Sequence, residues 1–229
     1  MIRHVLFDLD NTLYAPQTGL MAELDRRIIR YFARELGLRL PRAQQLQAEY
    51  CWQYGSCTIG VTRDTNLDLD HFLTDVHNIP VERYLEPDPA LDALLRQLQG
   101  EKWLFTNAPR EYAGRVLDAL EVAGHFRGVF DIRFMDFVGK PDPMAYQRVL
   151  KAIGARAEEC VMVEDSVVNL APAGELGMTT VLITTNGHAS ALWVDVLLED
   201  LTALPVALQL AGAGNEGTFR PPGSGEYVR

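Results

Sequence analysis

Two carboxylates stand one residue apart near the start of the chain, Asp8 and Asp10 in the run Asp8-Leu9-Asp10-Asn11-Thr12. Residues 2–8 form an apolar run without clean alternation, which is typical of a strand buried on both faces of a parallel sheet. Acids just past such a strand point into the crevice where open α/β sheets bind ligands. Because two acids this close repel each other, they need a cation or a shared proton. The structural alternative is a loop start whose acids cap the backbone.

Two later apolar runs also end in polar side chains, Thr106 and Asn107 after one, Glu164 and Asp165 after the other. Lys140 precedes a predicted helix start. Together with the first acidic pair, four carboxylates form an oxygen-rich site that suits a hard cation such as Mg²⁺. A metal beside a lysine and hydroxyl donors is what phosphoryl transfer requires. Each group alone has an ordinary alternative, as a helix cap, a surface lysine or an acidic strand end, but their order makes coincidence improbable.

Strand-like apolar runs and helical patterns alternate along most of the chain, and this alternation predicts βαβ units and a parallel sheet. Asp142 and Pro143 are typical of a helix start, and Gly154 of the end of the same helix. A second core helix is expected over residues 112–122. The predicted strands are 2–8, 102–106, 129–134, 160–163 and 179–184.

Residues 15–99 interrupt this alternation with consecutive helical patterns. Apolar residues recur every four positions from Leu20 to Leu36, and further helices are expected near residues 42–54, 70–76 and 88–99. We therefore expect an α/β protein with a Rossmann-like core formed by residues 1–14 and 100–205. A helical insertion would occupy 15–99, its last helix returning to the core. The Gly- and Pro-rich end, 206–229, is expected to be a mobile tail.

The composition indicates a folded protein that does not bind nucleic-acid polymers. The 229 residues are 48% hydrophobic and 23% charged, and 21 Lys and Arg stand against 31 Asp and Glu, a net charge of −10. A bound metal ion can reverse the local negative charge, so one small phosphorylated ligand can still bind. The three cysteines are sparse, and neither a signal peptide nor a membrane span is evident, so a cytoplasmic protein is expected. The sequence indicates no oligomeric state.

The four motifs, in this order, resemble those of the haloacid dehalogenase superfamily over roughly residues 1–205. The resemblance implies that Asp8 is a nucleophile that forms an aspartyl-phosphate, and that Asp10 is the general acid and base. Thr106 and Lys140 would orient the phosphoryl group. Dehalogenases of this superfamily lack an acid at the position of Asp10 and need no Mg²⁺, so phosphate-ester chemistry is favoured.

The same resemblance implies a Mg²⁺ site and a cap. The ligands would be Asp8, the backbone carbonyl of Asp10 and Asp165, with Glu164 in or near the metal's coordination shell. The helical insertion after the first motif resembles a C1-type cap, a lid that closes over small substrates and excludes water.

A finer resemblance points to the pyrimidine 5′-nucleotidase branch. It lies in residues 7–14, 53–55, 76–79 and 163–178, whereas residues 54–60 depart from the Tyr-Gly-Thr-Thr-Leu stretch of that branch. The residues expected to bind phosphate or substrate are Asn107, Thr12, Asn169, Tyr54 and His77. For Tyr54 and His77 the alternative is core packing, and for Asn169 a place on a helix surface.

The predicted function is hydrolysis of a small phosphorylated metabolite, a nucleoside monophosphate such as UMP or CMP, or a sugar phosphate. The alternatives are a sugar phosphatase, a phosphoglycolate phosphatase, a β-phosphoglucomutase-like enzyme, and a binding protein without catalysis. Because Asp8, Asp10 and Lys140 are all present, the last of these is disfavoured.

Overall fold

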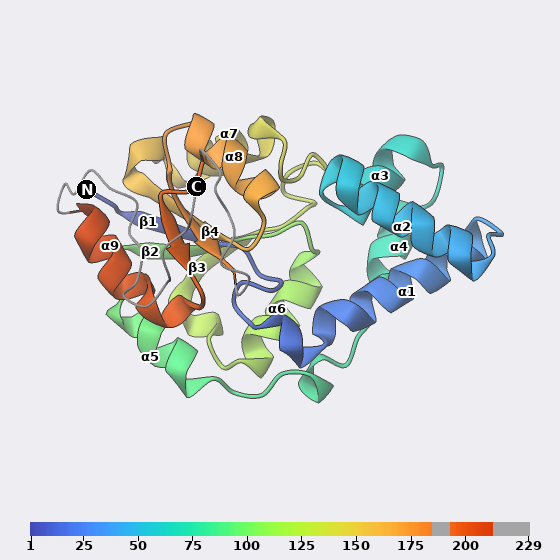
Figure 1. Ribbon diagram of the computed structural model, residues 1–229, viewed down its shortest axis with the longest axis horizontal. Coiled ribbons are helices and arrows are strands. Elements are labelled where there is room, and N and C mark those ends of the chain that lie inside the picture. Colours follow the sequence, from blue (N-terminus) through green and yellow to red (C-terminus); the bar gives the residue numbers. More distant parts are fainter. Residues whose placement is uncertain (185–192, 213–229) are drawn as a thin grey trace, which may run out of the picture.

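A parallel sheet of six strands forms the centre of the protein, in the order β3-β2-β1-β4-β5-β6 (Figure 1). The computed structural model describes residues 1–184 and 193–212. The expected α/β class with a Rossmann-like parallel sheet is confirmed. The strands are β1 (His4–Phe7), β2 (Glu101–Phe105), β3 (Phe126–Phe130), β4 (Cys160–Glu164), β5 (Thr179–Ile183) and β6 (Val196–Leu198).

Strand β1 lies in the middle of the sheet, paired with β2 on one side and β4 on the other. Val5, Leu6 and Phe7 are buried, as the unbroken apolar run predicted. The chain runs outward through β2 and β3, then crosses back to start the other half at β4. This reversal creates a crevice at the carboxyl ends of β1 and β4, where open α/β sheets bind their ligands.

Helices cover both faces of the sheet (Figure 1). Helices α7 (Pro143–Ile153) and α8 (Val167–Glu175) lie on one face. Helices α5 (Pro89–Gln97), α6 (Arg110–Ala119) and α9 (Leu204–Gly212) lie on the other. The ends of α7 are those that the sequence predicted, because the carboxylate of Asp142 accepts a hydrogen bond from the N–H of Met144 and Gly154 is left-handed.

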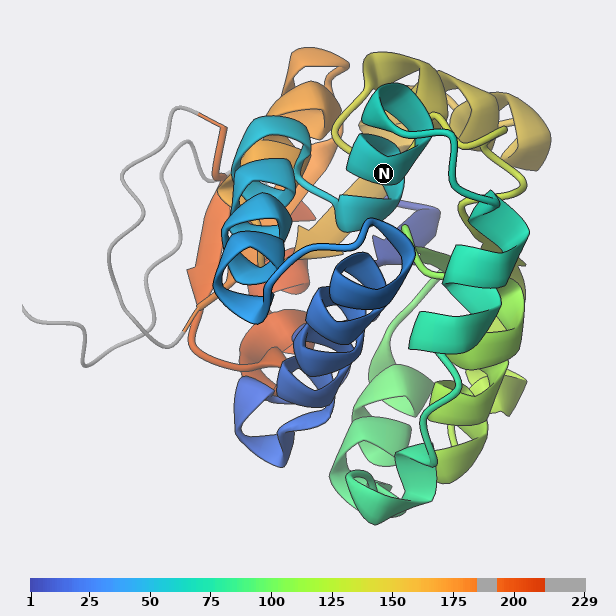
Figure 2. The same ribbon diagram turned by 90° about the vertical axis from the view of Figure 1, so that its right-hand side faces the viewer.

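Four helices gather at one end of the sheet (Figures 1 and 2). They are α1 (Leu20–Glu35), α2 (Leu40–Tyr54), α3 (Cys57–Asp64) and α4 (Leu69–Val76). On α1, the buried residues Leu20, Leu24, Ile28 and Phe32 keep the predicted four-residue spacing. Phe32 stacks on Phe72 of α4, with ring centroids 6.0 Å apart, so these helices share an apolar core.

Helix α3 was not predicted, because β-branched residues and Gly60 give this segment a low helix propensity. Tertiary packing outweighs that propensity. A Cβ at Gly60 would lie 2.3 Å from Cγ of Tyr50, so only glycine allows α3 to approach α2 this closely. Ser56 caps the helix by accepting a hydrogen bond from the N–H of Thr58.

The end of β3, the presence of β6 and the start of the C-terminal tail also differ from the prediction. Strand β3 ends at Phe130 rather than 134, because Asp131 turns the chain by accepting hydrogen bonds from the N–H groups of Arg110 and Phe134. Strand β6 was not anticipated. The expected mobile tail, 206–229, begins inside α9, where Ala207 is buried in the core, and its residues 213–229 lie outside those described. Within the described ranges, no helix is both long enough and apolar enough to cross a bilayer.

The turn before β2 places a glycine against the start of β1, which yields a stability prediction. Gly100 has φ +86° and a Cβ there would lie 2.6 Å from the carbonyl oxygen of Arg3, whereas Gly177, at φ +91°, has nothing within 4 Å. Gly177→Ala should cost about 1 kcal/mol of unfolding free energy through backbone strain alone. Gly100→Ala should cost about 2 kcal/mol more, because the new methyl group meets backbone. Urea unfolding checks the pair, and equal losses would contradict the proposed contact.

Candidate active site

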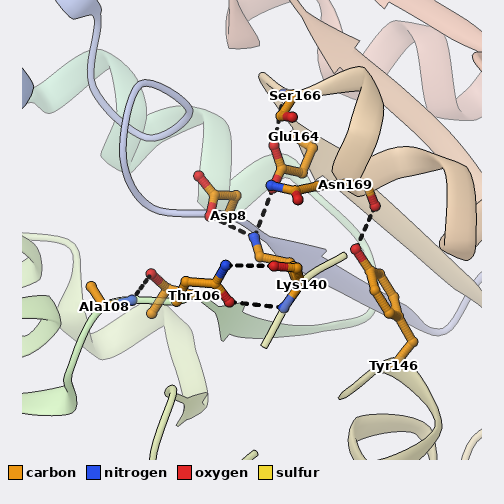
Figure 3. Close-up of polar contacts among 9 residues, drawn as sticks. Asp8, Thr106, Ala108, Lys140, Tyr146, Glu164, Ser166 and Asn169 are labelled. Carbon is orange, nitrogen blue, oxygen red and sulfur yellow. Dashed lines mark hydrogen bonds and ion pairs between the residues drawn. The ribbon is translucent and has the colours of Figure 1, made fainter. Parts of the chain in front are cut away.

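A buried lysine joins the ends of two strands (Figure 3). Lys140 comes from the loop before α7, and its Nζ lies 2.6 Å from Oδ1 of Asp8, just after β1, and 2.8 Å from Oε1 of Glu164, at the end of β4. The side chain of Lys140 is 1% exposed and that of Glu164 is 0% exposed. Asp8 lies 132 positions before Lys140 in the sequence, and Glu164 lies 24 positions after it. The three side chains thus meet in one ion-pair cluster.

The cluster carries more negative than positive charge. Burial opposes the charged form of Lys140, but Asp8 and Glu164 outweigh it and raise the lysine pKa above its ordinary value. Burial raises the pKa of Asp8, with Lys140 acting against it. Burial, then Glu164 and Asp8, raise the pKa of Asp165. One ammonium therefore faces several acids that have lost their hydration, an arrangement that favours a further cation.

Both oxygens of Glu164 are already engaged. Oε1 accepts from Lys140 and also from Nδ2 of Asn169 at 2.7 Å, and Oε2 accepts from the N–H of Ser166 at 2.7 Å. Tyr146 donates its hydroxyl proton to the backbone carbonyl of Asn169 and holds that turn of α8 in place. Glu164 thus acts as a fixed counter-charge that positions the lysine.

Asn107 holds the lysine from its backbone side. Its Nδ2 donates to the carbonyl of Lys140 at 2.8 Å, and its Oδ1 accepts from the N–H of Lys140 at 2.9 Å. A Cβ at the preceding Gly139 would lie 2.3 Å from Oδ1 of Asn107, so glycine is needed for this approach. The structure thus places Asn107, expected to bind phosphate, where its amide positions Lys140.

Asp10 is held by two tyrosines that the sequence analysis missed. Tyr14 and Tyr112 both donate hydroxyl hydrogen bonds to Oδ1 of Asp10, Tyr112 at 3.0 Å. Burial raises the pKa of Asp10, whereas these two hydrogen bonds lower it. Tyr14 stands four residues after Asp10, and this short separation in the sequence is a signal that could have indicated the contact. Tyr112 is 102 residues away, and no local pattern indicates its role.

A cavity of about 230 Å³ lies beside the ion-pair cluster, and Asp8 and Lys140 of that cluster line it. Asp8, Asp10, Thr106, Lys140 and Asp165 all line it, together with Asn107 and Asn169. Thr106 is 1% exposed, and its Oγ1 accepts from the N–H of Ala108 at 3.0 Å, which turns the chain after β2. The predicted catalytic set therefore converges on one cavity.

The other predicted binding residues have different surroundings. Thr12 is buried, and its Oγ1 has no hydrogen-bond partner among the described residues. It lines a neighbouring cavity of about 400 Å³, whose lining does not include Asp8 or Lys140. His77 does line the active-site cavity, but burial lowers its pKa to about 4 and its Nδ1 lies 2.9 Å from the carbonyl of Leu73. Tyr54 donates to Asp64 and is not among the described residues that line the cavity, so its role in substrate binding stays a prediction.

The acids suit a divalent metal. Asp8, Glu164 and Asp165 offer carboxylate oxygens within 4.8 Å of one another. Since both Glu164 oxygens already accept hydrogen bonds, Asp8 and Asp165 are the better ligands for a metal ion. Oxygen ligands of this kind fit a hard cation such as Mg²⁺.

Comparisons with known proteins identify the family of this chain. A family model described as haloacid dehalogenase-like hydrolase matches residues 2–177. Phosphate metabolism protein 8 of Saccharomyces cerevisiae is 26% identical in an alignment of 233 positions, gaps included, that covers 89% of this chain and 72% of that protein. A phosphoglycolate phosphatase of Pseudomonas putida is 29% identical in an alignment of 223 positions, gaps included, that covers 88% of this chain and 78% of that protein.

Solved structures show the same fold. A HAD phosphatase from Thermococcus onnurineus matches with a TM-score of 0.65 and 21% identity, over 95% of this chain and all of that one. A 2-haloacid dehalogenase from Pseudomonas syringae matches with a TM-score of 0.60 and 20% identity, over 92% of this chain and 100% of that one. At such identities the likeness concerns the fold and not the reaction.

The ion-pair cluster yields a second stability prediction. Lys140→Met should lower the unfolding free energy by about 3 kcal/mol or more, because Asp8 and Glu164 would remain buried without their cation. Lys102→Met is the matched control, since its Nζ donates only to the carbonyls of Leu98 and Gly100 among the described residues. The control should cost about 1 kcal/mol. Denaturant unfolding in EDTA measures both, and losses of equal size would contradict the assignment.

Proposed function

The chain belongs to the haloacid dehalogenase-like hydrolases, and from this premise we propose that it is a Mg²⁺-dependent phosphomonoesterase that acts on a small metabolite. The observation that carries the proposal is the buried Lys140 between Asp8 and Glu164, in one cavity with a second acid, Asp10. A nucleophilic carboxylate, a fixed cation and a separate proton donor are the groups that transfer of a phosphoryl group through a covalent intermediate requires.

In the first half-reaction, a carboxylate oxygen of Asp8 attacks phosphorus. A new O–P bond forms while the bond to the ester oxygen breaks, and the electron pair stays on the departing oxygen. Asp10 gives its proton to that oxygen, which leaves as an alcohol. Lys140 favours the ionised form of Asp8 before the attack, and Lys140 and Thr106 then bind the phosphoryl oxygens.

In the second half-reaction, water replaces the alcohol. The ionised Asp10 accepts a proton from water as its oxygen attacks the phosphorus of the aspartyl-phosphate. Inorganic phosphate leaves and Asp8 is regenerated. Tyr14 and Tyr112 keep the Asp10 carboxyl pointed into the cavity through both steps, since they bond its Oδ1.

The metal would be held by Asp8, Asp165 and the backbone carbonyl of Asp10, with Glu164 close by as a counter-charge. When bound, Mg²⁺ offsets negative charge at the phosphoryl group and its nucleophile. We further propose that residues 15–99 form a cap whose helices α1 to α4 close the cavity from above the strand ends and exclude water.

The substrate is proposed from two kinds of support. The resemblance to the pyrimidine 5′-nucleotidase branch makes UMP and CMP the first candidates. The relatives named as phosphoglycolate phosphatases make a small phosphorylated acid the second. Both candidates are monophosphates, and a panel of esters distinguishes them.

Phosphate release from UMP, CMP, phosphoglycolate and a sugar phosphate should require Mg²⁺, stop in EDTA and resume when Mg²⁺ is restored. Asp8→Asn should lower kcat by at least about 10³-fold, because an amide cannot attack phosphorus. Asp88→Asn is the matched control, since Asp88 caps α5, is not among the described residues that line the active-site cavity, and asparagine caps equally well. Full activity of the Asp8 variant would exclude it as nucleophile.

Tyr112→Phe should lower kcat about tenfold and leave KM nearly unchanged, because it removes a hydrogen bond to Asp10 and not to the phosphoryl group. Tyr31→Phe is the control, a buried tyrosine whose hydroxyl bonds His71 in the helical insertion. The split between kcat and KM from steady-state kinetics is the measurement. An equal fall in both variants would contradict a role for Tyr112 through Asp10.

A further inference from the structure

The wall of the active-site cavity opposite the strand ends is formed by one face of α1, by Cys51 and residues 55–58 where α2 meets α3, and by Phe72 and His77 of α4 and its end. Met21, Leu24 and Ile28 line it at the spacing of a single helix face, and Phe72 of α4 adds an aromatic ring. Asp25 lies on the same face and also lines the cavity. Among the described residues of this wall, Asp25 is the one formal charge, since the low pKa of His77 keeps its imidazole neutral.

Asp25 is fixed in place by the neighbouring helix. Its Oδ1 accepts a hydrogen bond from Nε2 of Gln47, on α2, at 2.8 Å. Burial raises the pKa of the Asp25 carboxyl, and the amide of Gln47 and the guanidinium of Arg26 act against that rise by favouring the ionised form. The carboxylate is therefore a positioned, half-buried group that a substrate in the cavity must face.

Within the described lining of the cavity, no free lysine or arginine is available to a second negative group on the substrate. Lys140 is the sole Lys or Arg among the described residues that line the cavity, and its ammonium already pairs with Asp8 and Glu164. Arg115 and Arg133 line a separate cavity behind His77. A carboxylate or second phosphate on the alcohol part of a substrate would thus face Asp25 with no free lysine or arginine in the described lining, which costs free energy of binding.

Resting on the proposed phosphomonoesterase function, we propose that Asp25 determines specificity by rejecting phosphomonoesters whose alcohol part carries a second anionic group. Esters of uncharged alcohols are accepted, and a hydrogen-bond donor or an ammonium group that reaches Asp25 is favoured. An uncharged nucleoside meets this requirement, whereas phosphoglycolate, with its carboxylate two carbons from the ester oxygen, does not.

Three esters of equal length test the proposal, because they differ mainly in the charge of their far end. They are phosphoglycolate, 2-hydroxyethyl phosphate and O-phosphoethanolamine, compared by kcat/KM in Mg²⁺. The wild-type protein should favour the neutral and the cationic ester over phosphoglycolate by roughly tenfold or more. Asp25→Asn, which keeps an oxygen for Gln47, should reduce this preference about fivefold or more, chiefly by raising kcat/KM for phosphoglycolate.

Glu23→Gln is the matched control. Glu23 lies two residues from Asp25 on the same helix, pairs with Arg26 and Arg27, and does not line the cavity. The preference should be unchanged in this variant, and thermal melting establishes that both variants are folded.

The outcomes separate the two proposals. Turnover with phosphoglycolate preferred, or a preference that Asp25→Asn leaves unchanged, overturns the role of Asp25 and leaves the phosphomonoesterase function standing. Absence of phosphate release from all three esters, from UMP and from p-nitrophenyl phosphate overturns the proposed function and this inference with it.

Discussion

A buried ammonium group must have counter-charges, and this requirement organises the centre of the protein. Lys140 is stable at 1% exposure because Asp8 and Glu164 both reach its Nζ. Those contacts need the ends of β1 and β4 to be neighbours, which the sheet order provides. They also need the lysine backbone to be held, which the amide of Asn107 achieves. The side chains of Lys140, Asp8 and Glu164 thus link the stability of the fold to its chemistry.

The excess of negative charge around Lys140 determines what the cavity can accept. Burial raises the pKa values of Asp8, Asp10 and Asp165, which shows how poorly the folded chain alone solvates these acids. A divalent cation, bound together with a phosphoryl group, would offset the negative charge of these acids. Asp10 is set apart from the other acids by its two tyrosine donors, so two neighbouring carboxylates are suited to different tasks.

The far wall of the cavity provides a second electrostatic constraint of the opposite kind. Near the strand ends, the carboxylates lie where a metal cation and Lys140 can neutralise their negative charge. On α1, the carboxylate of Asp25 accepts a hydrogen bond from Gln47 and has no lysine or arginine beside it in the described lining. One end of the site is therefore suited to an anion with its metal, and the other end to a neutral or cationic group.

The sequence by itself determined the βαβ order, the ends of α7, the acids at the strand ends and the lysine before α7, because burial, capping and charge spacing are local properties. It also indicated the helices of the insertion through their four-residue spacing. Only the tertiary structure decided the rest. Helix α3 forms because Gly60 lets it pack on Tyr50, Tyr112 reaches Asp10 across 102 residues, and Tyr54 turns to Asp64 rather than to the cavity. These contacts depend on how distant elements pack, and a local pattern carries no record of such packing.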